Sequence, residues 1–301
     1  MVAPPPQRSR LAGLVAHAGD RPRRRAAVAG RALGPSGSST MVTLDNLTVS
    51  YRQHPAFHHV SGHFAPSFLT AVVGPNGSGR STLLKSIVGL LPVAGWQLTV
   101  AVPAGRAAYL PQIADIERNF PIDVRDCVLG GCWPLKRARG SVDAVQLQRV
   151  DAALADVGLQ GFERRPIGSL SSGQLQRVLF ARLLVQNADL MLLDEPFNAI
   201  DSKTTTALLA LIARWHQNRQ MVIVVLHNDA QVLQHFPQSL LLARELVALG
   251  PTEGVMTQAS LTIARAMAEV WDEDADMCEI DAPTSSPARA AVPAHPQKAA
   301  A

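Results

Sequence analysis

The chain has 301 residues, of which 47% are hydrophobic and 17% charged, and its net charge at pH 7 is +4. This composition supports one large hydrophobic core or two modest ones, and the 5% of aromatic residues argues against a stacking platform for nucleic-acid bases. No apolar run reaches the length of a membrane span, so any link to a membrane would run through a partner. The three cysteines form no even disulfide framework, which is typical of a reducing compartment.

Charge is concentrated at the two ends of the chain. Residues 1–40 hold seven arginines and one aspartate, and residues 272–301 are first acidic and then rich in alanine and proline. We expect both ends to be disordered and residues 41–271 to form the folded domain. Residues 1–40 imitate a transit peptide, but we favour an upstream extension of a reading frame that starts at Met41. The folded part carries only +2, so nucleic acid is not an expected partner.

The folded part opens with β-structure. Apolar residues alternate over residues 42–51, and a second β-like piece covers residues 57–64 after a turn at residues 53–55. The pattern predicts an antiparallel sheet that leads into a strand ending at Val73. Tyr51 is either a ring that stacks on an adenine or a plain residue at a sheet edge.

Four histidines crowd this region, namely His54, His58, His59 and His63. A zinc site is conceivable. However, His58 and His59 should face opposite sides of a strand, and no cysteine or carboxylate completes a set nearby. We therefore favour a solvated loop.

A glycine-rich stretch, residues 74–82, follows the apolar run 69–73 and precedes a helix start. It fits G-x-x-x-x-G-K-[ST] except that Arg80 replaces the lysine. Backbone N–H groups and the helix N-terminus should bind phosphate oxygens, and Ser81 can place its hydroxyl on Mg²⁺. The residues expected around the phosphates are Gly74, Pro75, Asn76, Gly77, Ser78, Gly79, Arg80, Ser81 and Thr82.

Short strands and turns are expected over residues 95–109. Gln112 follows them and could reach Mg²⁺ or an attacking water. Residues 142–157 have helical spacing, with Gly158 as the stop. Ser171, Ser172, Gly173 and Gln174 precede another apolar helix and indicate a second anion-binding turn.

Two buried strands end in polar side chains. Residues 189–196 form an apolar run that ends in Asp194 and Glu195, and residues 221–226 form another that ends in His227. Such ends line active-site crevices in parallel sheets. Asp194 suits Mg²⁺, Glu195 suits activation of water, and His227 could hold a γ-phosphate, although each carboxylate alone could be a helix cap or a surface charge.

The C-terminal part of the folded domain should contain a hairpin and a helix. Residues 239–243 and 246–249 are expected to pair as two strands, closed by Gly250 and Pro251, and residues 260–270 have helical spacing.

In this order, the motifs resemble those of the ATP-binding subunit of ABC transporters, over about residues 42–270. The matches are Tyr51 for adenine stacking, 74–82 for the Walker A loop, Gln112 for the Q-loop, 170–174 for the LSGGQ signature with Ser172 in place of its first glycine, 190–195 for Walker B with the catalytic Glu195, 198–201 for the D-loop with Asp201, and His227 for the switch histidine.

The resemblance implies an α/β P-loop cassette with a RecA-like core, an antiparallel β subdomain and an inserted α-helical subdomain at about residues 113–185. It implies ATP and Mg²⁺ as cofactors, with Ser81, Gln112 and Asp194 near the metal. A homodimer would form head to tail, so that Ser171 and Gly173 meet the γ-phosphate of the other copy. The partners implied are an integral membrane permease and, indirectly, a periplasmic or extracellular substrate-binding protein, at the cytoplasmic face of the inner membrane.

The segment 119–130 is similar to the zinc and manganese importer branch, as are residues 197–201 and 249–253. Importers of iron-siderophores or cobalamin stay open as alternatives.

Arg80 is the main departure from the family pattern. It keeps the charge of lysine, but its planar fork is longer and wider than an ammonium group. Because Asp194, Glu195 and His227 are all present, we expect slow but real ATP hydrolysis. The alternatives are a nucleotide-binding regulator without turnover, an exporter subunit, and a soluble ABC ATPase of translation or DNA repair, which the single cassette disfavours.

Overall fold

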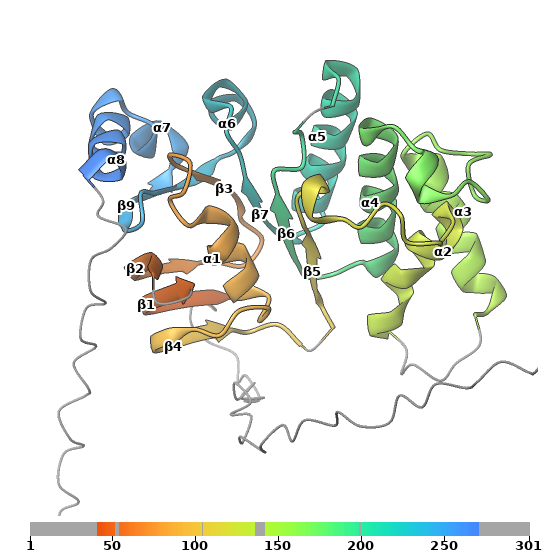
Figure 1. Ribbon diagram of the computed structural model, residues 1–301, viewed down its shortest axis with the longest axis horizontal. Helices are drawn as coiled ribbons and strands as arrows, with labels where there is room; N and C mark the ends of the chain where they lie inside the picture. The colour runs from red at the N-terminus through yellow and green to blue at the C-terminus, as the bar shows by residue number, and fades with distance from the viewer. Residues whose placement is uncertain (1–40, 52–53, 104, 136–141, 199, 271–301) are drawn as a thin grey trace, which may run out of the picture. The chain divides into compact units, whose positions relative to one another are not determined.

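The computed structural model describes residues 41–51, 54–103, 105–135, 142–198 and 200–270. The two ends that were expected to be disordered lie outside these residues. The described residues contain two sheets, with helices packed around them (Figure 1).

A three-stranded antiparallel sheet comes first in the chain. Its central strand β1 (Val42–Tyr51) pairs with β2 (His54–Phe64) on one side and with β4 (Ala94–Val100) on the other. Val42 and Leu44 and then, after a shift in register, Leu47 and Val49 are buried, which confirms the strand predicted from their spacing. Strand β2 begins at His54, earlier than the predicted β-like piece, which began at residue 57.

The second sheet has six strands in the order β5-β6-β7-β3-β8-β9. The first five run parallel: β5 (Ala107–Leu110), β6 (Leu190–Asp194), β7 (Met221–Val225), β3 (Leu69–Val73) and β8 (Gln238–Leu242). Strand β9 (Leu246–Pro251) returns antiparallel to β8 and confirms the predicted hairpin. Gly250 and Pro251 belong to β9 instead of closing it.

Strand order decides where the candidate site residues meet. Strands β3, β6 and β7 are fully buried, as their unbroken apolar runs indicated. Although β3 follows β2 in the chain, it lies in the parallel sheet between β7 and β8. The carboxyl ends of β3, β7 and β6 are therefore neighbours at one edge, where parallel sheets bind their ligands.

Each face of the six-stranded sheet contacts its own hydrophobic core. Val72, Leu192 and Ile223 pack with α1 (Arg80–Ile87) and the antiparallel sheet. Their neighbours Ala71, Leu193 and Val224 join the second core on the other face. That core includes residues of α5 (Ser202–Gln217), α6 (Asp229–His235), α7 (Thr252–Val255) and α8 (Gln258–Val270).

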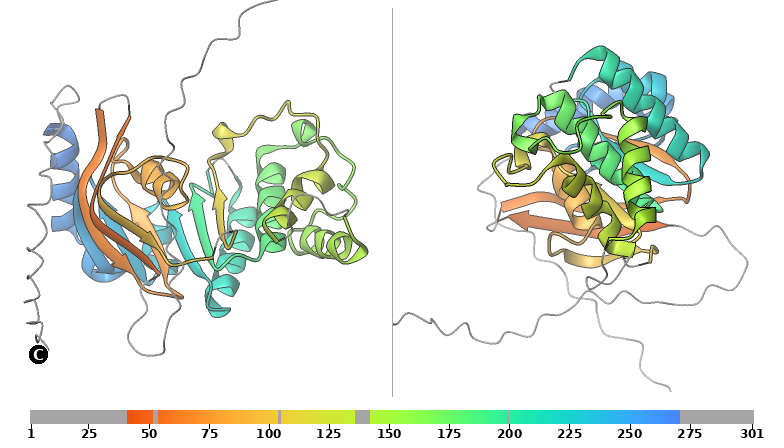
Figure 2. Two further views of the ribbon diagram at one scale, coloured as in Figure 1. Left: turned by 90° about the horizontal axis from the view of Figure 1, so that it is seen from below. Right: turned by 90° about the vertical axis from the view of Figure 1, so that its right-hand side faces the viewer.

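The helices described between β5 and β6 form a separate group (Figure 2). Its elements are η1 (Ile113–Asp115), α2 (Val124–Leu129), η2 (Gly130–Leu135), α3 (Ala144–Asp156), η3 (Ile167–Ser169) and α4 (Ser172–Gln186). Helix α3 confirms the helix predicted over 142–157, and Gly158 follows its C-cap with a φ of 68°. Phe180 of α4 stacks on Trp215 of α5 at 5.7 Å between ring centroids, so this group packs against a helix that covers the sheet. Within the described residues, no helix is both long and apolar enough to cross a bilayer.

Candidate functional site

The phosphate loop connects β3 to α1, as its sequence predicted. Gly74 has a φ of 150°, and a Cβ there would collide with the carbonyl oxygen of Leu242. Gly79 has a φ of 90° as the N-cap of α1, and a Cβ there would lie 2.7 Å from the carbonyl oxygen of Ala56. Only glycine fits both positions without strain. The first helical residue is Arg80, so the backbone N–H groups at the start of α1 open onto the loop.

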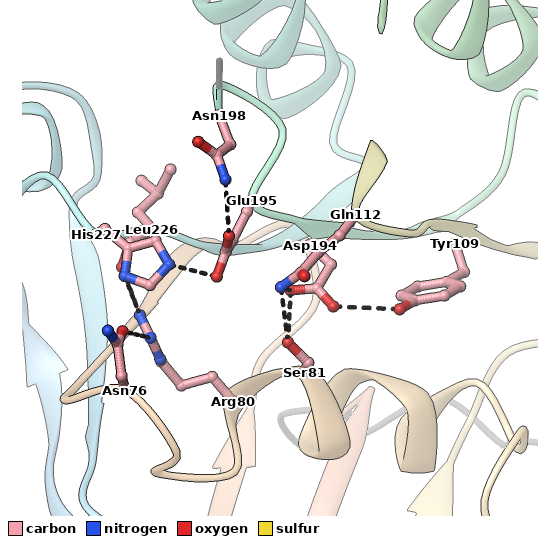
Figure 3. Close-up of polar contacts among 10 residues, drawn as sticks. All are labelled: Asn76, Arg80, Ser81, Tyr109, Gln112, Asp194, Glu195, Asn198, Leu226 and His227. Carbon is pink, nitrogen blue, oxygen red and sulfur yellow. Dashed lines mark hydrogen bonds and ion pairs between the residues drawn. The ribbon is translucent and has the colours of Figure 1, made fainter. Parts of the chain in front are cut away.

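Asp194 is the most deeply buried polar group of the site, with a relative exposure of 0%. Its Oδ1 accepts a hydrogen bond from Ser81 Oγ at 2.9 Å, and its Oδ2 accepts one from Tyr109 Oη at 3.2 Å (Figure 3). Gln112 Nε2 lies 3.2 Å from Ser81 Oγ and 3.5 Å from Asp194 Oδ1. Burial raises the pKa of the Asp194 carboxyl, and the hydrogen bonds that it accepts oppose that rise.

These side chains fit a Mg²⁺ ion. Mg²⁺ prefers oxygen ligands, and the hydroxyl of Ser81 and the carboxylate of Asp194 are already adjacent. No lysine or arginine forms an ion pair with Asp194 in the described part of the chain. A buried carboxylate without such a partner favours a bound cation. Gln112 presents its amide nitrogen, so its side chain would have to rotate to offer Oε1.

Glu195 follows Asp194 with an unusual backbone. Its φ of 49° turns the chain out of β6, and a non-glycine residue adopts this region at a cost that is typical of functional sites. Oε2 accepts a hydrogen bond from Asn198 Nδ2 at 3.4 Å, and Oε1 contacts Nε2 of His227. The Glu195 side chain is 13% exposed and that of His227 is 44% exposed. This carboxylate thus stands at the border between the buried group around Asp194 and solvent.

Arg80 lies across the phosphate loop and is only 6% exposed. Its Nη1 donates to the carbonyl oxygen of Leu226 at 3.1 Å and lies 3.0 Å from His227 Nδ1, while Nη2 donates to Asn76 Oδ1 at 3.4 Å. Burial lowers the pKa of the guanidinium, and the charges of Glu195 and Asp194 oppose this. The group stays charged, because arginine is not deprotonated in proteins.

The serine-rich turn at residues 171–174 forms the N-terminus of α4. Ser171 Oγ accepts from Gln174 N–H at 3.2 Å, and Gln174 Oε1 accepts from Ser171 N–H at 3.0 Å, which is a capping box. Ser172 has helical backbone, so the replacement of glycine there needs no positive φ. Among the described residues, no hydrogen bond or ion pair joins this turn to the phosphate loop of the same chain.

Asp201 is engaged by its own helix. Its Oδ1 accepts from Thr204 N–H at 2.8 Å as the N-cap of α5, and this hydrogen bond lowers the pKa of the Asp201 carboxyl. Gly173 lies beside it: a Cβ on Gly173 would be 3.9 Å from Asp201 Oδ2. The side chain of Tyr51 lies outside the described part of the structure.

Two comparisons decide the family. A family model described as ABC transporter matches residues 57–198. The manganese transport system ATP-binding protein MntB of Listeria monocytogenes is 38% identical over 226 residues, which cover 73% of this chain and 94% of that protein. The zinc transport system ATP-binding protein TroB of Treponema pallidum is 36% identical over 234 residues, covering 74% and 86%.

The chain belongs to the ABC transporter family. Among solved structures, a chain from a proposed metal-chelate type ABC transporter in an inward-facing conformation has a TM-score of 0.67 at 26% identity, covering 76% of this chain and 90% of that chain. An ATP-binding cassette of an ABC transporter in its ADP conformation has a TM-score of 0.64 at 17% identity, which supports the fold alone. The expected cassette fold, nucleotide binding and ATPase class are thus confirmed. As the ATP-binding subunit of an ABC transporter, the chain works with a membrane permease.

The structure brings most of the expected ABC motifs together. Walker A, the Q-loop, Walker B and the switch histidine meet at one edge of the parallel sheet. The signature and the D-loop lie next to each other at the N-termini of α4 and α5. In Figure 1, α1 and α4 lie on opposite sides of strands β5 and β6.

The expectation for the histidines was wrong. His59 has a φ of 55°, which breaks the alternation of β2, and its ring lies edge-on to that of His58 at 5.1 Å between centroids. His58 pairs with Glu245 at 3.1 Å, and His59 Nδ1 lies 2.7 Å from Asn46 Oδ1. These residues belong to a strand and not to a loop. In the described residues, no group of three or more histidine, cysteine or acidic side chains could hold a metal ion.

Three participants were not predicted from the sequence: Tyr109, the side chain of Asn198 as a partner of Glu195, and the Leu226 carbonyl. Tyr109 pairs in register with Leu192, two residues before Asp194 on β6, and therefore shares a face of the sheet with it. A tyrosine in a strand, three residues before the Q-loop glutamine, was the available signal. Its partner could be named only once β5 was known to lie next to β6.

Proposed function

We propose that this chain hydrolyses ATP to drive import of a divalent transition-metal ion, manganese or zinc, through a membrane permease. The observation that carries the proposed hydrolysis is the position of Asp194, Glu195 and His227 at the ends of neighbouring strands beside the phosphate loop. Manganese and zinc come from the relatives, which are named as transport systems for these ions. The similarity of residues 119–130 to the same branch also supports this substrate class.

The site offers the groups that phosphoryl transfer to water requires, which are positioning and charge stabilisation. Arg80 and the loop N–H groups would bind phosphate oxygens. Ser81 and Asp194 would hold Mg²⁺, with Gln112 beside them, and the ion supplies positive charge to the phosphate oxygens when bound. Glu195 would accept a hydrogen bond from the attacking water, and His227 would donate one to the γ-phosphate.

A second copy of the chain would complete each site. The turn at 171–174 forms an anion-binding helix N-terminus, and its position beside Asp201 leaves it without a hydrogen bond to its own phosphate loop in the described residues. Two chains related by a twofold axis would place the signature of one chain opposite the phosphate loop of the other. We infer that the dimer binds the permease at the cytoplasmic face of the inner membrane, with a substrate-binding protein on the far side.

Uptake into proteoliposomes tests the substrate. The chain is reconstituted with the permease that co-purifies with it and with the substrate-binding protein, and ATP-driven accumulation of Mn²⁺ and Zn²⁺ is compared with that of a ferric siderophore and cobalamin. We expect accumulation of Mn²⁺ or Zn²⁺ that is lost in Glu195→Gln. Accumulation of the siderophore or cobalamin instead, or ATP-driven release, would overturn the proposed substrate or direction.

A nucleotide-binding regulator is the second candidate, because the guanidinium of Arg80 spreads over Asn76, Leu226 and His227 where the motif has a lysine. The two functions differ in turnover. Measuring ATP affinity and phosphate release on the same preparation separates them. Tight binding without release above the Glu195→Gln level, with the permease present, would favour the regulator.

A further inference from the structure

His227 is contacted at both ring nitrogens by charged groups from two other elements. Nη1 of Arg80, at the start of α1, lies 3.0 Å from Nδ1, and the carboxylate of Glu195, after β6, contacts Nε2 (Figure 3). His227 itself follows β7, which lies between β6 and β3 in the sheet. The ring therefore bridges the phosphate loop and the Walker B carboxylates.

The chemistry of arginine gives this bridge a direction. A guanidinium carries only N–H donors and has no acceptor. Nδ1 of His227 must therefore accept, which means that it carries no proton in this arrangement. The proton of the neutral ring is then on Nε2, where it donates to a carboxylate oxygen of Glu195. The opposite tautomer would set an N–H against the guanidinium and a lone pair against the carboxylate.

Both ends of the bridge are anchored. Arg80 is held by the carbonyl oxygen of Leu226 at 3.1 Å and by Asn76 at 3.4 Å, and it is only 6% exposed. The second oxygen of Glu195 accepts from Asn198 at 3.4 Å. Hydrogen bonds thus run from Arg80 through His227 to Glu195 in one direction only.

We propose that Arg80 is a positioning residue that holds His227 as its neutral Nε2–H tautomer, so that the ring always presents a donor toward Glu195 and the γ-phosphate. This inference rests on the proposed function of these two residues. A lysine side chain is one atom shorter and ends in a single nitrogen, whereas the guanidinium can reach the loop and the histidine with separate nitrogens. The arginine thus gives Walker A a contact to the switch histidine in addition to its charge.

Nitrogen NMR of nucleotide-free protein tests the tautomer without relying on turnover. The full chain is labelled with ¹⁵N-histidine, and the His227 signals are assigned by their loss in His227→Gln. At a pH where the ring is neutral, we expect a protonated Nε2 and an unprotonated Nδ1. In Arg80→Met, which has no donor, the excess of the Nε2–H form should fall by about tenfold, the value for a hydrogen bond to a charged group.

Arg265→Met is the matched control, because Arg265 is exposed on α8; it should leave the His227 signals unchanged. If Arg80→Met does not fold, as judged by the signals of the other histidines, Arg80→Leu, which also lacks a donor, gives the same measurement. A protonated Nδ1 in the wild type, or an unchanged tautomer ratio in the folded variant, overturns the inference. Absence of ATPase activity with the expected tautomer would instead overturn only the proposed function.

Discussion

Asp194 accepts hydrogen bonds from three side chains that lie in different parts of the chain. Ser81 is on α1, Tyr109 is on β5 and Gln112 follows β5, and all three turn toward one fully buried carboxylate. Ser81 and Gln112 contact Oδ1, whereas Tyr109 alone contacts Oδ2 among the described residues. We infer that Tyr109 fixes the rotation of the carboxylate and leaves Oδ1 directed at the hydroxyl of Ser81.

Tyr109→Phe removes this hydrogen bond and keeps the ring. A hydrogen bond from a neutral donor to a charged group contributes roughly 1.5–3 kcal/mol. We therefore expect the Mg²⁺ concentration for half-maximal ATPase activity to rise by about tenfold or more. Mn²⁺ binding to the protein with a non-hydrolysable ATP analogue, followed by electron paramagnetic resonance, should weaken in parallel. Unchanged metal affinity in a folded variant would contradict the positioning role.

Glu195→Gln isolates the hydrolysis step. The amide keeps an acceptor for His227 but cannot activate water as a carboxylate does, so we expect ATP binding to persist and phosphate release to stop. The wild type should release phosphate slowly, because Arg80 occupies the lysine position. Phosphate release by the wild type no faster than by this variant, with the permease present, would show that the site binds ATP without turnover.

The contacts of Arg80 and Tyr109 show why residue-level prediction was incomplete. Residue types at short spacing predicted the phosphate loop, Asp194, Glu195 and His227, because each follows an apolar strand. The partners of Arg80 and Tyr109 are 147 and 85 positions away in the chain. Such pairs depend on strand order, which local patterns do not contain.

At the scale of elements, two helices begin with the same structure in different surroundings. Helix α4 starts with a capping box between Ser171 and Gln174, and α3 starts with one between Asp143 and Gln146. The turn of α4 is proposed to bind phosphate, whereas the turn of α3 contributes none of the candidate site residues described above. Substitutions at the two capping residues, Ser171 and Asp143, can therefore distinguish an effect on stability from an effect on function.

We expect Ser171→Ala and Asp143→Ala to destabilise the protein similarly, by about 1 kcal/mol each. For a domain of this size that lowers the melting temperature by roughly 2–4 °C. Only Ser171→Ala should also reduce ATPase activity beyond its effect on stability, measured below the transition. Equal activities of the two variants would mean that the serine is only a helix cap.

Element prediction succeeded where apolar runs were unbroken and missed several helices. The buried strands β3, β6 and β7 were predicted nearly to their ends. Helices α2, α6 and α7 have four to seven residues and hold too few apolar positions to show a period. Helix α5 was not predicted, although its buried residues Leu208, Leu211, Ile212 and Trp215 have helical spacing.

At the scale of the whole molecule, the six-stranded sheet joins two surfaces that have separate roles. One edge holds the phosphate loop and the proposed catalytic residues, and the helices between β5 and β6 hold the signature. The family assignment follows from the order of the motifs and the similarity to ATP-binding subunits. The boundaries 41–271 and 113–185 stay predictions.

Mixing two inactive variants tests whether the sites are shared between copies. Arg80→Ala damages the phosphate loop, and Gly173→Arg damages the signature. In a head-to-tail dimer of one copy of each, both defects fall in the same site and the other site is intact. Random pairing makes half of the dimers mixed, so if each site works alone the mixture should regain about a quarter of the wild-type ATPase rate.

Each variant alone should stay inactive. A mixture of Arg80→Ala with Glu195→Gln should also stay inactive, because both changes lie on the same side of the interface and every site of a mixed dimer keeps one defect. Recovery in that control, or none in the first mixture although size-exclusion chromatography shows dimers, would contradict shared sites.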